Sequence, residues 1–194
     1  MTEYAYVTLV ATDIYAAGAL VLGHRLRDFG STQDLLCLVT GDISPTALEH
    51  LSQLYKVVHV DTLKSIDEEN LALLGRPELD VTFTKLHLWS LTGYKKLVFL
   101  DADTLPLRNI DELFDRPNFS AAPDAGWPDC FNSGVFVTEP SETEYLGLKK
   151  MATERGSFDG GDQGLLNSYF SNWSLSSSAH RLPFTYNTTP TSQY

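Results

Sequence analysis

The chain has 194 residues, of which 43% are hydrophobic and 11% aromatic, and a formal net charge of −11. These values are typical of one globular domain with a sizeable core and exclude a disordered chain. The acidic balance argues against a nucleic-acid partner, because nucleic-acid phosphates attract Lys and Arg. It still permits a phosphate-bearing small molecule that is held through a metal ion.

The cysteine content and the hydropathy indicate an intracellular protein. There are two cysteines, and Cys37 lies in an apolar run, so we expect it in the core and expect no disulfide framework. No segment has the length of a membrane span, and the first residues lack a secretory signal pattern. We therefore expect a cytoplasmic protein with no membrane partner.

The first sixty residues alternate between strand and helix. We expect strands at residues 5–10, 35–39 and 57–60, and helices at residues 15–29 and from Pro45 onward. Ser44 suits the N-cap of the second helix, and Pro45 suits its first position. This alternation predicts an α/β fold with a Rossmann-like, doubly wound, mostly parallel sheet in a single domain.

The rest of the chain adds shorter elements. We expect strands at 97–100 and 119–122, helices at 84–91, 142–155 and 165–170, a turn leading into a strand at 132–137, and a flexible turn at 160–164.

The apolar run 97–100 is typical of a strand buried on both faces. Asp101 and Asp103 follow it, and ligands of open α/β sheets bind beyond the carboxyl ends of the strands. If the chain stays extended there, both carboxylates point the same way, because strand side chains alternate with period two. Such a pair favours a hard divalent cation, which could neutralise a diphosphate. Alternatively, the two residues only form a turn or cap a helix.

An ordered set of motifs resembles glycosyltransferase family 8, in particular its self-glucosylating members. The motifs are Phe-Leu-Asp-Ala-Asp-Thr (99–104), Asp-Cys-Phe-Asn-Ser-Gly-Val-Phe (129–136), Gly-Ser-Phe-Asp-Gly-Gly-Asp-Gln-Gly (156–164) and Thr-Lys-Leu-His-Leu-Trp (84–89). The resemblance covers essentially the whole chain. It implies a GT-A fold, an Mn²⁺ ion, UDP-glucose as donor and a homodimer. It also implies that glucose is attached to the protein's own tyrosine with retention of configuration, which primes glycogen synthesis.

The resemblance assigns roles around the donor. Asp101 and Asp103 would ligate Mn²⁺, a Lewis acid for the leaving UDP, with Ala102 between them in the donor site. Leu9, Thr12 and Tyr15 would lie near the base, and Tyr15 would either stack on uracil or be a core aromatic. Arg76 and Lys85 would be cations that meet phosphate or acid groups, or else solvated surface charges.

Further roles concern the sugar. Asn132 and Ser133 would bind sugar hydroxyls or form an ordinary turn. Asp159, Asp162 and Gln163 lie in a glycine-bracketed loop, where a backbone can approach a ligand closely. The resemblance makes Asp162 the candidate for assisting transfer, as a nucleophile or an electrostatic stabiliser.

Tyr194 falls in the register of the family's self-glucosylated tyrosine. Its phenol has an ordinary pKa of about 10, so a base or metal-assisted departure of UDP must help the transfer. By itself, a terminal tyrosine is more often a frayed side chain.

The sequence departs from the family pattern at its end. The family's third metal ligand is a histidine in a segment resembling His-Phe-x-Gly-x-x-Lys-Pro-Trp, which this chain lacks, and none of its five histidines matches it. We therefore expect a catalytic domain over residues 1–194 that is truncated at its carboxyl-terminal end, without the region that binds glycogen synthase. The alternatives are a family 8 transferase with an external acceptor, or a non-catalytic nucleotide-sugar-binding fragment.

Overall fold

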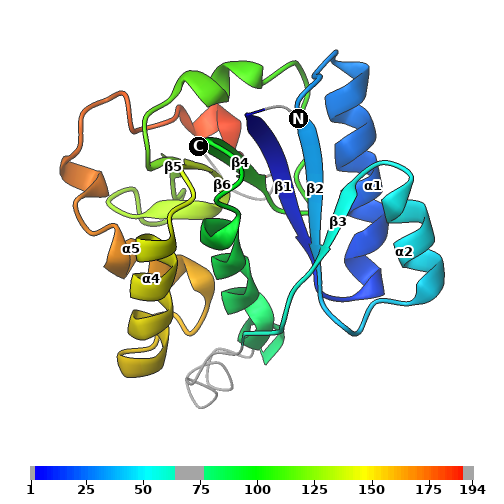
Figure 1. The fold of residues 1–194 in the computed structure, drawn as a ribbon. Coiled ribbons are helices and arrows are strands. Elements are labelled where there is room, and N and C mark those ends of the chain that lie inside the picture. Colours follow the sequence, from blue (N-terminus) through cyan, green and yellow to red (C-terminus); the bar gives the residue numbers. More distant parts are fainter. Residues whose placement is uncertain (1–2, 64–76, 190–194) are drawn as a thin grey trace.

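A six-stranded mixed sheet forms the centre of the molecule (Figure 1). The computed structural model describes residues 3–63 and 77–189. The sheet order is β3-β2-β1-β4-β6-β5. The strands are β1 (Tyr4–Val10), β2 (Asp34–Val39), β3 (Lys56–His59), β4 (Lys96–Leu100), β5 (Ser120–Pro123) and β6 (Phe131–Thr138). β1 to β4 are parallel, whereas β6 runs antiparallel to both β4 and β5.

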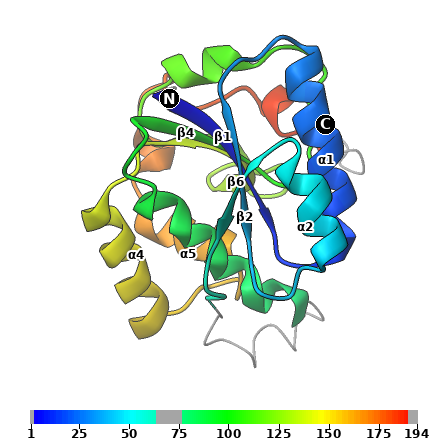
Figure 2. The same ribbon diagram turned by 45° about the vertical axis from the view of Figure 1, so that its right-hand side comes forward.

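Helices cover both faces of the sheet (Figure 2). One face packs against α1 (Asp13–Asp28) and α2 (Pro45–Ser52). The opposite face packs against the 3₁₀ helix η1 (Pro77–Ser90), α4 (Glu142–Glu154) and α5 (Asp162–Tyr169). The described residues also contain three short 3₁₀ turns, namely η2 (Asp111–Asp115), η3 (Trp173–Leu175) and η4 (Phe184–Tyr186).

The alternation of side chains in β1 shows why both faces are covered. Tyr6 and Val10 pack toward α1 and α2, whereas Ala5 and Val7 pack toward η1 and α4. Both sets are apolar and buried, so each face needs a helical layer. The predicted Rossmann-like, doubly wound, mostly parallel sheet is confirmed.

Local signals in the sequence explain several element ends. The Ser44 hydroxyl accepts a hydrogen bond from the Ala47 amide at 3.2 Å, with Pro45 in the first turn of α2, as predicted. Both cysteines are free thiols, and Cys37 is fully buried, so the core prediction for it is confirmed. No helix within the described ranges is long and apolar enough to cross a membrane.

Two predicted turns are wrong. Residues 132–134 lie inside β6 and not in a turn before it. Pairing with β4 and β5 supplies backbone hydrogen bonds that outweigh the turn preference of Asn, Ser and Gly. Asp162 lies in the first turn of α5, with Gly161 at the N-cap, and not in a flexible turn.

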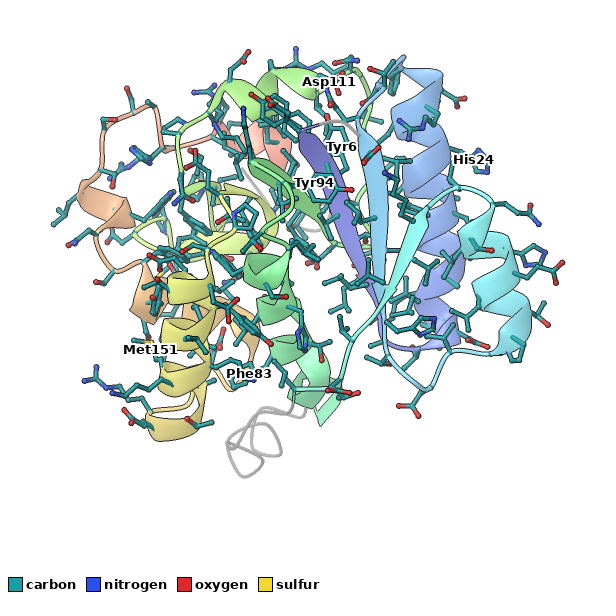
Figure 3. All side chains as sticks on the ribbon, viewed as in Figure 1. Tyr6, His24, Phe83, Tyr94, Asp111 and Met151 are labelled. Carbon is teal, nitrogen blue, oxygen red and sulfur yellow. The ribbon has the colours of Figure 1, made fainter. Side chains whose placement is uncertain are left out.

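A buried hydroxyl joins the sheet to the segment after β4. The Tyr6 hydroxyl in β1 donates a hydrogen bond of 2.7 Å to Asp111 of η2 (Figure 3). Burial and the neighbouring carboxylate raise the pKa of Tyr6 well above its usual range, so it remains a donor. The segment between β4 and η2 is thereby fixed at both ends.

Candidate active site

The site lies where β4 ends and β6 begins. Because β6 is antiparallel to β4, its first residues meet the carboxyl end of β4, and the Asp101 amide donates to the Gly134 carbonyl at 2.8 Å. Asp101 and the segment Asn132–Gly134 are therefore neighbours in space. The strand direction brings together two motifs that are about thirty residues apart along the chain.

The chain turns at Asp101 and is not extended there. The Thr104 amide and hydroxyl both donate to the Asp101 carbonyl, at 3.0 and 2.7 Å. The condition of an extended strand end is therefore not met, and the period-two argument for aligning the two carboxylates does not apply. A compact turn presents them, with Ala102 buried and Asp103 exposed.

Helix α1 supports this turn from one side. A Cβ atom on Gly18 would overlap with the carbonyl oxygen of Ala102. Only glycine allows this approach of a helix to a turn.

Lys85 is the junction of the site. Its ammonium lies 2.6 Å from Asp162 Oδ2 and 3.2 Å from Asp101 Oδ1, and it donates to the Ser133 carbonyl at 3.2 Å. It also lies 4.5 Å from the centroid of the Phe99 ring, a cation–π contact. Only 4% of the side chain is exposed, so the alternative of a solvated surface charge is wrong.

The charges of this junction depend on one another. Burial alone would lower the pKa of Lys85, but Asp101 and Asp162 outweigh it and raise this pKa, so the ammonium stays charged. Loss of hydration, together with Asp162 and Asp103, raises the pKa of Asp101 to about 6, although Lys85 opposes this rise. The Asp101 side chain nevertheless remains 40% exposed, so an incoming cation can reach it.

Asp124 is a functional candidate that sequence reasoning missed. Its Oδ2 accepts hydrogen bonds from Asn132 Nδ2 and Gln163 Nε2, both at 3.2 Å. Burial alone would raise its pKa, but these bonds and those from the Gly126 and Trp127 amides lower it. The available signal was its position directly after a strand, the same argument that singled out Asp101.

The network continues to β6 and to the segment after η4. Gln163 Oε1 accepts a hydrogen bond from the Ser133 amide at 3.2 Å. Asn187 Nδ2 donates to Asn132 Oδ1 at 2.6 Å. Asn187 was also missed, and no local pattern in the sequence identifies it. The structure thus brings together four of the residues that the sequence predicts for the sugar side of the site, namely Asn132, Ser133, Asp162 and Gln163. Asp124 and Asn187 lie in the same network.

Asp159 organises the loop that leads into α5. Its Oδ1 accepts three hydrogen bonds, from the Ser157 hydroxyl at 2.7 Å and from the amides of Gly161 and Gly164 at 2.9 and 3.0 Å. A Cβ atom on Gly164 would overlap with Asp159 and Ser157. This oxygen therefore holds the loop, and Asp162 and Gln163 are placed by it.

Leu9, Thr12 and Tyr15 lie along the connection from β1 to α1. Leu9 is partly buried, Thr12 occupies the N-cap position of α1, and Tyr15 is 44% exposed. The alternative that Tyr15 is a core aromatic is therefore wrong, and its ring is accessible to a planar ligand. Arg76 and Tyr194 lie outside the described residues.

The residues present fit a divalent cation in part. Asp101 and Asp103 offer hard oxygen donors, which such a cation prefers. Gly134 leaves room beside them, because a Cβ there would be 3.1 Å from Asp101 Oδ2. Within 3–63 and 77–189, no group of three or more His, Cys, Asp or Glu residues could hold a metal.

Comparison with known proteins decides the family. The family model described as Glycosyl transferase family 8 matches residues 6–120, which is more than half of the chain. The chain belongs to glycosyl transferase family 8. The Asp101–Asp103 turn and Lys85 lie within the matched region, whereas the other half of the site follows it.

Curated members of family 8 match the whole chain. Human Glycogenin-1 is 54% identical over 195 aligned residues, covering 100% of this chain and 56% of the relative. Glycogenin-1 of Caenorhabditis elegans is 56% identical, covering 95% of this chain and 43% of the relative. Glycogenin of Neurospora crassa is 46% identical, covering 99% of this chain and 28% of the relative. The chain thus spans about half or less of the length of these relatives.

Solved structures of more distant proteins share the fold. The galactosyltransferase LgtC, in complex with donor and acceptor sugar analogs, has a TM-score of 0.58 at 20% identity, covering 86% of this chain and 70% of its own. The Streptococcus pneumoniae glycosyltransferase GlyE has a TM-score of 0.66 at 20% identity, covering 96% of this chain and 46% of its own. These likenesses support the predicted GT-A fold of this family 8 chain.

Proposed function

We propose that this protein transfers glucose from UDP-glucose to its own Tyr194 with retention, then extends the chain to prime glycogen synthesis. One observation carries the proposal. A buried, charged Lys85 joins Asp101 of the candidate metal turn to Asp162 and to the Ser133 carbonyl. The predicted metal, phosphate and sugar residues therefore meet at one point.

The donor would lie along the carboxyl edge of the sheet. Its uracil would lie beside Leu9 and Thr12 and stack on the exposed ring of Tyr15. Its diphosphate would meet Mn²⁺ on Asp101 and Asp103, beside Ala102, and Arg76 would contribute a further positive charge. Mn²⁺, when bound, supplies Lewis-acid stabilisation of the departing diphosphate.

The glucose would lie in the network on the other side of Lys85. Hydrogen bonds already join Asp124 to Asn132 and Gln163. A sugar hydroxyl that is buried here would find hydrogen-bond partners, so its burial would not leave an unpaired polar group. Ser133 lines this position, and Asp159 fixes the loop from behind. These residues would orient the anomeric carbon toward Asp162.

The transfer step would form a bond between the Tyr194 phenol oxygen and glucose C1. The bond between C1 and the diphosphate oxygen breaks, UDP leaves with the electron pair, and the phenol proton passes to a carboxylate or to solvent. Asp162 would stabilise the positive charge that develops at C1, and Lys85 holds this carboxylate in place. In later cycles a glucose hydroxyl replaces the phenol as nucleophile.

The resemblance to the glycogenins supports the remaining parts of the proposal. These parts are a homodimer in the cytoplasm, with glycogen synthase as a partner through a further carboxyl-terminal region. Residues 1–194 would be the catalytic unit. The strong overall negative charge is compatible with this set of partners, because none of them is a nucleic acid.

Intact-mass spectrometry after incubation with UDP-glucose and Mn²⁺ tests the proposal. We expect a ladder of single-hexose additions that is lost in Tyr194→Phe. Addition of hexose to a supplied sugar or protein, with no self-labelling of this chain or of a longer one, would identify an external-acceptor transferase. UDP binding that requires Mn²⁺ without any turnover would identify a binding module. Either result would overturn the proposed self-glucosylation.

A further inference from the structure

A hollow lies near the candidate active site. It has a volume of about 180 Å³ and is formed where the loop between β5 and β6 meets the carboxyl-terminal half of α5 and η3. Asp129, Cys130, Phe158, Ser168, Ser171 and Ser174 are among the residues that line it. It is smaller than the roughly 300–1,000 Å³ of sites for drug-sized ligands, so it suits a group the size of one sugar ring.

Hydrogen bonds connect the hollow to the active site. The Asn167 side chain, which lines the hollow, donates to the carbonyls of Phe131 and Gln163, both at 2.9 Å. The side chain of Gln163 in turn contacts Asp124 on the active-site side. One turn of α5 therefore separates the hollow from the proposed sugar position.

The loop between β5 and β6 makes the same connection. The Trp127 amide donates to Asp124 at 3.1 Å, and the Cys130 amide donates to the Trp127 carbonyl at 2.8 Å. Asp124 thus faces the active site, while Cys130 faces the hollow, within one hydrogen-bonded loop. The β5–β6 loop and α5 therefore each contribute residues both to the active site and to the lining of the hollow.

The chemistry of this surface fits a carbohydrate. Phe158 in the hollow is 65% exposed, and Trp127, in the same loop as the lining residue Asp129, is 76% exposed. An aromatic face can stack on the apolar face of a sugar ring. Serine hydroxyls and the exposed Asp129 carboxylate can exchange hydrogen bonds with sugar hydroxyls. A purely apolar partner would leave these polar groups unsatisfied.

We propose that the hollow is a subsite for an α-linked glucose oligomer, the growing product of the active site. The proposal rests on the proposed function, because that function supplies the ligand. A chain that grows by one glucose per cycle must keep its free end at the active site while its earlier units move away. A subsite one helical turn away holds those units and keeps the free end close.

Cys130 provides a direct reporter of binding. It is partly exposed in the hollow, whereas the chain's other cysteine, Cys37, is fully buried. Iodoacetamide should therefore alkylate Cys130 selectively in the full-length chain. We expect maltohexaose to slow this alkylation in a saturable way, and sorbitol at equal mass concentration to leave it unchanged.

Phe158→Ala tests the stacking contribution. We expect it to weaken the protection by maltohexaose about fivefold, because one aromatic stacking contact is worth about 1 kcal/mol. Leu146→Ala on α4, whose side chain is 58% exposed, is the matched control and should retain full protection. In the mass ladder, Phe158→Ala should add the first hexose at the wild-type rate and later hexoses about fivefold more slowly.

The outcomes separate the subsite from the proposed function. A wild-type hexose ladder without protection of Cys130 would overturn the subsite and leave self-glucosylation standing. Protection without any ladder would support a glucan site while overturning self-glucosylation. Alkylation that slows as protein concentration rises, in the absence of sugar, would show that a second copy covers the hollow, and it would overturn the proposal.

Discussion

Gly18 in α1 and Ala102 in the turn after β4 are in backbone contact, so close that a Cβ on Gly18 would overlap with the Ala102 carbonyl oxygen. The turn between Asp101 and Asp103 thus rests directly on a helix. Packed backbone deforms little, and any atom added at Gly18 must move the turn or the helix. The position of the two candidate metal ligands is therefore set partly from α1.

Gly18→Ala should weaken Mn²⁺ binding without unfolding the protein. Overpacking of a well-packed contact costs about 1–3 kcal/mol, and displacement of the turn relieves part of this cost. We expect an affinity for Mn²⁺ at least about fivefold lower by isothermal titration, since 1 kcal/mol corresponds to that factor. Gly93→Ala is the control, because a Cβ there meets nothing within 4 Å. Equal affinities of both variants would contradict the packing argument.

Lys85→Met should destabilise the protein strongly. It leaves Asp101 and Asp162 facing each other without their shared cation, and loss of one partner of a buried ion pair costs about 3–5 kcal/mol. Urea unfolding measures this change. Lys95→Met removes the exposed ion pair with Glu3 and should leave the free energy of unfolding almost unchanged, because solvent screens such surface pairs. A similar decrease in the free energy of unfolding in both variants would show that the Lys85 ion pairs are no more important for stability than an exposed pair.

Asp103→Asn should abolish Mn²⁺-dependent binding of UDP. The substitution removes one of the two negative charges that the turn offers to a cation, while the exposed side chain has little effect on folding. Titration of UDP with and without Mn²⁺ gives the readout. Asp115→Asn, another exposed acid in η2, serves as the control. Unchanged UDP affinity in Asp103→Asn would remove this residue from the metal site.

Asp162→Asn should spare UDP binding and slow hexose transfer by about 10²–10³-fold, the usual effect of losing one charge-stabilising group. The amide oxygen can still accept a hydrogen bond from Lys85, so the loop should keep its position. The initial rate of self-labelling at saturating UDP-glucose measures the effect. A wild-type rate would exclude Asp162 from the transfer step.

His87 should make the protein less stable below neutral pH. Its ring nitrogens contact the Asp61 carbonyl at 3.0 Å and the Tyr145 hydroxyl at 2.9 Å. Burial, aided by Lys149, lowers the pKa of His87 below 6.5, although Asp61 opposes this. The unfolded chain then binds the proton first, so the free energy of unfolding falls as pH drops through 6.5.

Urea unfolding between pH 8 and pH 5 tests this sign. His87→Gln should lose this part of the pH dependence. His24→Gln should keep it, because the His24 side chain is exposed. An imidazole pKa for His87 at or above 6.5 by NMR would contradict the prediction. The same contacts explain why His87 packs against α4 instead of facing the active site.

The sequence by itself determined the fold class and most members of the site. The apolar run 97–100 and the alternation before it required a sheet covered on both faces, because no other arrangement buries those side chains. The ordered motifs then indicated the family. Asp101 could be selected from its place after a buried strand, whereas Lys85, Asp162 and Asn132 could be selected because each stands in a motif that resembles the family.

Only the tertiary structure decided how these residues meet. The antiparallel direction of β6 puts Asn132 beside Asp101, and hydrogen bonds between strands cancel the local preference of that segment for a turn. Lys85 became a buried junction because η1 packs under the sheet. Asp124 and Asn187 joined the site through hydrogen bonds to Gln163 and Asn132 that are long-range in sequence. The position of Asp124 after a strand was a local signal, but no local pattern identifies Asn187 or shows which partners either residue meets.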